Sequence, residues 1–116
     1  MFPYKNLEVY NKAFTQNQKI YNLLKDKSGI PLYLKNQLGR ASLSVMLNIA
    51  EGSGRFSKKD RRNFYIIARS SAFESAALVD FLFIENEIKP EENLVLISGF
   101  EEISKVLFVM IRNLEK

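Results

Sequence analysis

Five basic side chains lie within eight residues of the chain, and their chemistry is the binding of phosphate. These residues, the basic rim, are Arg55, Lys58, Lys59, Arg61 and Arg62. Lysine and arginine neutralise phosphate charge, and a helix that begins at the same place adds exposed N–H groups and a positive dipole. Because no motif that reads base sequence accompanies them, binding to RNA or DNA would follow charge and shape. The alternative is a solvated helix start that keeps the protein soluble.

Carboxylates are the other candidates for chemistry. Glu51 and Glu74 would suit acid–base or metal chemistry as a pair, but they are expected on different helices, and we interpret both as structural. The chain has no cysteine and no histidine, which excludes thiolate and imidazole catalysis and the usual zinc sites. The segment Gly52-Ser-Gly54 is too short for a phosphate-cradling loop. We therefore expect no enzyme activity, no metal and no cofactor.

Composition and apolar spacing define the elements that must position these residues. With 116 residues, 47% of them apolar and 26% charged, the chain is expected to form one globular domain over residues 1–116. No apolar signal core opens it, and no apolar run is long enough to span a membrane, so we expect a cytoplasmic protein.

The apolar residues recur every three, four or seven positions, which predicts helices and no strands. The expected helices cover residues 4–26, 31–51 and 57–88, with a fourth that begins at Pro90. Gly52 and Gly54 are expected to end the second helix in the left-handed conformation, and Ser57 to cap the third. Short connections between four such helices predict an all-α, antiparallel up-down-up-down four-helix bundle.

Each helix is expected to bury one stripe of side chains. For the first helix the stripe is Leu7, Tyr10, Phe14, Tyr21 and Leu24. For the third it is Phe64, Ile67, Ser71, Leu78 and Phe81, and for the fourth Leu96, Phe100, Ile103, Leu107, Met110 and Leu114. Between Ala41 and Ala50, however, the second helix is apolar on all sides. A bundle of this size cannot enclose its own helix, so we expect contact with another subunit; the alternative is an apolar monomer surface.

Polar residues are expected along the seam between the second and third helices. The members of this polar seam are Arg40, Asn48, Glu51, Arg69 and Glu74. Folding the helical hairpin places Arg40 near Glu74, where Arg69 competes for the same carboxylate, and it places Ser44 near Ser71. Pairs of this kind fix the register of two helices more than they add stability. Glu51 is expected beside an arginine of the basic rim, either Arg61 or Arg62.

Charge is distributed unevenly along the chain. Residues 1–70 carry thirteen basic and four acidic side chains, whereas residues 71–116 carry four basic and nine acidic ones. This asymmetry suggests an anionic partner for the first part, or a complementary face on another copy of the chain in a ring of heterologous contacts. The alternative is two oppositely charged, solvated faces.

Three segments form a specific motif in the middle of the chain. They are Asn48-Ile-Ala-Glu-Gly-Ser-Gly-Arg55, Ser57-Lys-Lys-Asp-Arg-Arg-Asn-Phe64 and Ile67-Ala-Arg-Ser-Ser-Ala-Phe-Glu74, and they are supported by Tyr4-Lys-Asn-Leu-Glu-Val9, Gln37-Leu-Gly-Arg-Ala41 and Ser44. With them the chain resembles the small bundle proteins encoded in intervening sequences of bacterial large-subunit ribosomal RNA genes. It departs from that pattern at Gly39, Met46 and Ser70, and the arginine absent at position 39 weakens a basic strip there.

This resemblance implies a four-helix bundle that assembles as a ring-shaped homopentamer, with no established catalytic residues. The family is also similar to accessory bundle proteins of diversity-generating retroelements, which are basic pentamers that bind a reverse transcriptase and nucleic acid. We therefore expect a non-enzymatic oligomer that binds structured RNA or DNA through the basic rim. The alternative is a scaffold or accessory factor that binds protein. Phe56 and Tyr65 either stack on a base or belong to the core.

Overall fold

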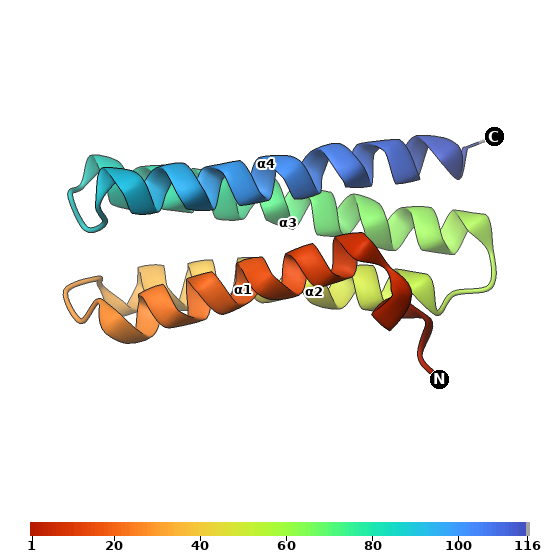
Figure 1. Ribbon diagram of the computed structural model, residues 1–116, viewed down its shortest axis with the longest axis horizontal. Helices are drawn as coiled ribbons and strands as arrows, with labels where there is room; N and C mark the ends of the chain where they lie inside the picture. The colour runs from red at the N-terminus through yellow and green to blue at the C-terminus, as the bar shows by residue number, and fades with distance from the viewer. Residues whose placement is uncertain (116) are drawn as a thin grey trace.

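The computed structural model describes residues 1–115, which form a bundle of four α-helices preceded by one short 3₁₀ helix (Figure 1). The elements are η1 (Pro3–Asn6), α1 (Glu8–Asp26), α2 (Leu32–Ser53), α3 (Lys58–Ile84) and α4 (Pro90–Asn113). Successive helices run antiparallel and pack on one another, and α4 closes the bundle against α1. The predicted all-α, antiparallel four-helix bundle is confirmed.

The two ends of the bundle differ in what they carry (Figure 1). The α1–α2 and α3–α4 turns lie at one end, and the α2–α3 turn lies at the other. The first residues of the chain and Glu115 also lie at the end with the α2–α3 turn, because η1 contacts α2 and Glu115 pairs with Arg62 at the start of α3. The basic rim therefore shares its end of the molecule with the first and last described residues.

The core stripe of α4 agrees with the prediction except near its C-terminal end, where Ile111 is buried and the predicted Met110 and Leu114 are only partly buried. Leu96, Phe100, Ile103 and Leu107 are all buried. The stripe of α1 does not agree. In α1 the buried residues are Val9, Ala13, Gln16, Ile20 and Leu23. The predicted stripe was wrong at Phe14 and Tyr21, which are 44% and 64% exposed. The true stripe contains a small alanine and a polar glutamine, so the larger aromatic side chains on the neighbouring face dominated the pattern.

The α3 stripe was also displaced. Ser71 is buried as predicted, but Ile67 and Phe81 are about half exposed. The side chains that face the core are Tyr65, Ala68, Ser71, Ala72, Ser75, Val79 and Leu82. Several of these are small, which allows α3 to approach its neighbours closely and leaves larger apolar side chains outside.

The helix boundaries shift where the turns have their own geometry. Helix α1 begins at Glu8 and not at Tyr4, because η1 occupies Pro3–Asn6 and Leu7 is extended. Helix α3 ends at Ile84, four residues earlier than expected, and in the following turn Asn86 has a positive φ of 59°.

The two glycines at the end of α2 do not adopt the predicted left-handed conformation, since no glycine has a positive φ. Gly54 has an ordinary φ of −92°. Gly52 is buried where α2 meets α3, and a Cβ there would lie 2.8 Å from Tyr65 Cε1 and 3.0 Å from Phe64 Cβ. Its role is therefore the close approach of two helices. The predicted cap of α3 is confirmed, because Asp60 N–H donates to Ser57 Oγ at 3.0 Å.

Candidate nucleic-acid interface

The basic rim lies on the α2–α3 turn and the first turns of α3. Arg55 belongs to the turn, and the other four members follow the N-cap residue Ser57. Lys58 and Lys59 are exposed, and Arg61 and Arg62 are partly buried. The positive end of the α3 dipole lies among these side chains, so the backbone and the side chains favour the same sign of ligand charge.

Two arginines of the basic rim are paired with carboxylates. Arg55 Nη2 lies 3.3 Å from Glu51 Oε1, and its guanidinium carbon lies 4.6 Å from the centre of the Phe64 ring. Arg62 donates from Nε and Nη2 to Glu115 Oε1 at 3.1 and 2.8 Å. All four charged side chains are between 37% and 57% exposed. Exposed pairs of this kind contribute little stability, and a phosphate can replace the carboxylate.

Arg61 has a structural contact as well as a charge. Its Nη2 donates to the Phe56 carbonyl at 3.4 Å, which holds the turn against the first part of α3. Its Nε is buried and has no hydrogen-bond partner among the described residues. Lys59 is exposed and takes part in none of the ion pairs within residues 1–115.

The two aromatic candidates for base stacking have different surroundings. Tyr65 is 5% exposed and belongs to the core. Burial raises the pKa of its hydroxyl, although the Arg61 charge acts in the opposite direction. Phe56 is fully exposed on the α2–α3 turn. Of the two, only Phe56 is therefore available to a ligand.

The polar seam between α2 and α3 is only partly as predicted. Ser44 Oγ lies 2.8 Å from Ser71 Oγ, as expected, and Asn48 Nδ2 donates to the Ser44 carbonyl at 2.8 Å. The predicted Arg40–Glu74 pair is not formed. Glu74 instead accepts a hydrogen bond from Gln37 Nε2 at 2.5 Å. Gln37 lies three residues before Arg40, so the predicted register was wrong by slightly less than one turn at this end.

The other two members of the polar seam also have different partners. Arg69 points to α4 and not to Glu74: its Nε donates to the Ser104 carbonyl at 3.2 Å, and its guanidinium lies over the rings of Phe73 and Phe108. Glu51 pairs with Arg55, four residues later, and the predicted contact with Arg61 or Arg62 was wrong. Within residues 1–115, no three acidic, cysteine or histidine side chains come together as a metal site.

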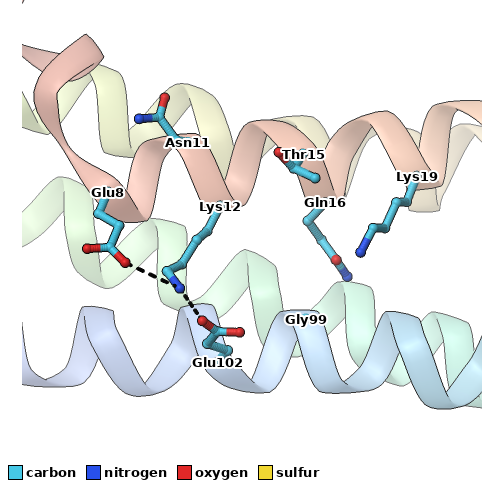
Figure 2. Close-up of a pocket in the computed structure, with 8 residues that line it drawn as sticks. All are labelled: Glu8, Asn11, Lys12, Thr15, Gln16, Lys19, Gly99 and Glu102. Atoms are coloured by element: carbon cyan, nitrogen blue, oxygen red, sulfur yellow. Dashed lines mark hydrogen bonds and ion pairs between the residues drawn. The ribbon is translucent and has the colours of Figure 1, made fainter.

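The seam between α1 and α4 carries charge pairs that the sequence did not reveal. Figure 2 shows Lys12 and Gln16 reaching from α1 toward α4 across a hollow of about 350 Å³. Lys12 pairs with Glu8 at 3.5 Å and with Glu102. These contacts raise the pKa of Lys12, chiefly through the hydrogen bond to Glu102, and the same bond lowers the pKa of Glu102. Gln16 donates to the Leu96 carbonyl at 2.7 Å.

A second ion pair joins the end of α1 to the start of α4, since Lys27 Nζ lies 3.0 Å from Glu92 Oε1. Together with the Lys12–Glu102 and Arg62–Glu115 pairs, it uses opposite charges from the two halves of the sequence within one subunit. The basic first half and the acidic last part are thus partly complementary inside the bundle.

Glu92 is expected to stabilise the start of α4, next to the α3–α4 turn at the end of the bundle opposite the basic rim. Burial disfavours its charged form, but the hydrogen bond from Lys89 N–H at 2.8 Å and the pair with Lys27 outweigh it, so the pKa of Glu92 is lowered. A lowered carboxyl pKa stabilises the fold above the unfolded-state pKa, and this contribution is lost as pH falls through the folded-state pKa. We expect Glu92→Gln to lower the free energy of unfolding by about 1 kcal/mol at pH 7.

Urea unfolding at pH 7 and at pH 3 would measure this change. The difference between wild type and Glu92→Gln should shrink at pH 3, because the stabilisation from a carboxyl with a lowered pKa decreases as the pH falls below its unfolded-state pKa. Glu91→Gln is the matched control, because Glu91 is exposed and has no such hydrogen bond among the described residues. Equal effects of the two substitutions at pH 7 would contradict the assigned role of Glu92.

Comparison with known proteins agrees with the bundle geometry. A crystal structure of a protein of unknown function from the S23 ribosomal protein family of Bacteroides thetaiotaomicron superimposes with a TM-score of 0.84. The two sequences are 25% identical, and the match covers 89% of this chain and 97% of that one. No curated protein matches the chain. No helix within residues 1–115 is long and apolar enough to cross a membrane.

The motif that suggested the family resemblance lies between Asn48 and Glu74, and the match to the family includes all of it. The family described as 23S rRNA-intervening sequence protein matches residues 5–109. This range contains all four helices except the last turn of α4, and it includes the whole basic rim. The resemblance is confirmed: the chain belongs to the 23S rRNA-intervening sequence protein family.

Proposed function

We propose that this protein is a non-enzymatic bundle that binds structured RNA or DNA through the basic rim. The observation that supports this function best is the concentration of five basic residues at the N-terminus of α3. Lys58 and Lys59 are exposed there, and the helix dipole adds to their charge. The ligand is recognised by its phosphates, because no motif that reads base sequence accompanies the basic rim.

Engagement of Arg62 and Arg55 by phosphate requires the exchange of an ion pair at each. A phosphate that reaches Arg62 must displace Glu115, and one that reaches Arg55 must displace Glu51. Both carboxylates are exposed, so they return to water at little cost. Removal of Glu115 should therefore strengthen binding, because it frees a guanidinium that already lies at the surface.

Fluorescence anisotropy with a labelled RNA hairpin tests this function. We expect tight binding at low salt and a steep loss of affinity between 50 and 200 mM salt, as counterion release requires. Charge reversal in an Arg61→Glu, Arg62→Glu variant should lower the affinity at low salt by about tenfold or more. Glu115→Gln should raise it by a few-fold.

The matched control carries the same change of charge outside the basic rim. Lys25→Glu with Lys105→Glu alters two exposed lysines, one near the opposite end of the bundle and one on α4. We expect a much smaller loss of affinity for this variant. The proposed function is overturned if the wild-type protein does not bind at low salt, or if both charge variants lose the same affinity.

We also propose that the protein is a homo-oligomer, and the family resemblance favours five subunits. Large apolar side chains remain exposed on all four helices of the bundle, among them two groups on α2 and α4. These two groups are Leu43 and Leu47 on α2, and Leu94, Val95, Phe108 and Val109 on α4. A ring would bury part of this surface and would repeat the basic rim in every subunit, which increases affinity through avidity.

Light scattering at micromolar protein concentration measures the assembly. An oligomeric mass supports the proposal, and Leu43→Glu should lower that mass, since Leu43 is exposed on α2 outside the hollow beside Phe56 and a charge would then lie in a subunit contact. A strict monomer would overturn it. The exposed apolar residues would in that case favour the other candidate function, a scaffold or accessory factor that binds a different protein.

A further inference from the structure

Four aromatic rings form a continuous series at the end of the bundle that carries the basic rim. The distances between successive ring centres are 5.8 Å for Phe2–Tyr4, 4.7 Å for Tyr4–Tyr10 and 6.2 Å for Tyr10–Phe14. This aromatic ladder runs from η1 onto α1. Its two ends are open to solvent, because Phe2 is 67% exposed and Phe14 is 44% exposed. None of these rings belongs to the set of fully buried core side chains.

The first two rings of the ladder border a hollow of about 1110 Å³. The α2–α3 turn forms its other side, with Phe56 and Arg55, and the exposed side chain of Leu47 from α2 also lines it. Phe56 is fully exposed, so nothing within residues 1–115 covers its ring. The hollow thus has aromatic rings on two sides and directly adjoins the basic rim.

We propose that this hollow binds unpaired nucleotides, whose bases stack on Phe56, Phe2 and Tyr4 while the basic rim holds the adjoining phosphates. The inference rests on the proposed nucleic-acid binding and specifies its ligand as a single-stranded segment, such as a loop or an end. Bases in a duplex are stacked on one another and offer no free face, whereas unpaired bases stack readily on aromatic side chains.

The charges around the hollow support bases as its occupants. Glu51 and Asp60 line it together with Arg55. Glu51 is paired with Arg55, whereas the Asp60 carboxylate forms no ion pair within residues 1–115 and repels phosphate, so we expect the sugar–phosphate chain on the outer, basic side of the α2–α3 turn and the bases in the hollow. The bases are uncharged and apolar on their faces, and they fit a hollow whose lining is mainly aromatic and aliphatic.

A single tryptophan reporter tests this site directly, because the chain has no tryptophan. Phe56→Trp places an indole at the fully exposed position, where it does not disturb the core. We expect its fluorescence to be quenched by an oligouridine of about ten nucleotides and to remain unchanged with an abasic oligonucleotide of the same length. Quenching by both would show that the phosphates alone are sensed, and it would overturn the proposal.

Affinity measurements on the intact protein give the second readout. Phe56→Ala combined with Tyr4→Ala should weaken binding to the oligouridine by about tenfold, since one stacked base contributes on the order of 1–3 kcal/mol. Binding to an RNA duplex should change less than twofold. The matched control is Phe81→Ala, which removes a ring that is 46% exposed on α3 and does not line the hollow.

The outcomes separate this inference from the function on which it rests. If the wild-type protein binds neither single-stranded nor duplex RNA at low salt, the proposed function itself fails. If it binds both equally and the aromatic variants behave like wild type, the basic rim retains its function and the hollow does not bind bases. If the emission maximum of Phe56→Trp shifts as the protein concentration is raised without RNA, a second copy of the chain occupies the hollow. In that case the proposal is wrong.

Discussion

Replacing Phe100 with alanine should lower the free energy of unfolding by about 4 kcal/mol, the largest effect that we expect from a single substitution. Phe100 is 1% exposed and is among the largest fully buried side chains of the bundle. It lies on α4 beside the small residues Ala72 and Ala76 of α3, which cannot extend to fill the space that its ring would leave. The cost therefore includes the cavity as well as the lost burial.

Phe108→Ala is the matched control, since it makes the same chemical change two turns later on the same helix. The Phe108 ring is 45% exposed and contacts the guanidinium groups of Arg69 and Arg112. Its loss should cost about 1 kcal/mol or less. Chemical denaturation at pH 7 measures both variants. If both variants lost the same free energy of unfolding, the assignment of Phe100 to the core face of α4 and of Phe108 to its outer face would be wrong. A domain of this size has about 5–15 kcal/mol of stability in total, so Phe100→Ala should remain folded at low temperature.

The second large effect is expected at Gly52 of α2, which packs closely against α3 near the basic rim. A Cβ at this position would lie 2.8 Å from Tyr65 Cε1 and 3.0 Å from Phe64 Cβ. The Phe64 Cβ is fixed to the backbone of α3, so the two helices must separate to admit the methyl group. We expect Gly52→Ala to lower the free energy of unfolding by about 2 kcal/mol, against the usual helical preference for alanine.

Gly54→Ala is the control for this substitution, two residues away in the same turn. A Cβ there would meet only the Glu51 carbonyl at 3.7 Å, and its φ of −92° is one that alanine adopts. We expect no loss, and a gain of up to about 1 kcal/mol because the unfolded chain has fewer conformations. Thermal unfolding of the two variants measures the contrast. A stabilised Gly52→Ala protein would contradict the close helix contact.

The Gly52→Ala substitution should also affect the proposed RNA binding. If α2 and α3 separate, Arg55 moves relative to the four basic residues of α3, and the hollow beside Phe56 changes shape. Gly52→Ala should therefore weaken RNA binding in proportion to the displacement, although it removes no charge. A loss of affinity in this variant would link the geometry of the basic rim to the close contact of α2 and α3 at Gly52.

The fold could be predicted from the sequence because strong local signals agreed. Pro90 at the start of α4, Ser57 at the start of α3 and the regular apolar spacing of α4 each act within a few residues. The core faces of α1 and α3 could not be predicted as well. The buried face of α1 includes Gln16, whose amide donates to the Leu96 carbonyl of α4. No pattern of apolar residues identifies a buried glutamine whose partner is a distant backbone atom.

The candidate site shows the same division between local and distant contacts. The position of the basic rim on a helix start followed from its own residues. Its partners did not, because the Glu115 that pairs with Arg62 lies 53 residues later, and the pairs Lys12–Glu102 and Lys27–Glu92 depend on α1 lying beside α4. The register of α2 on α3 was correct at Ser44 and Ser71 and wrong at Glu74. Long polar side chains select among several neighbours, and sequence spacing alone does not decide which.

The position of the first residues of the chain and of Glu115 beside the α2–α3 turn has a practical consequence for how the protein is immobilised. A purification tag or sensor-surface linkage at either end would emerge next to the basic rim and would hold that face against the matrix (Figure 1). The α1–α2 turn lies at the opposite end, and Ser28 in it is exposed. Because the chain has no cysteine, Ser28→Cys would provide a unique thiol for oriented attachment, with the basic rim directed into solution.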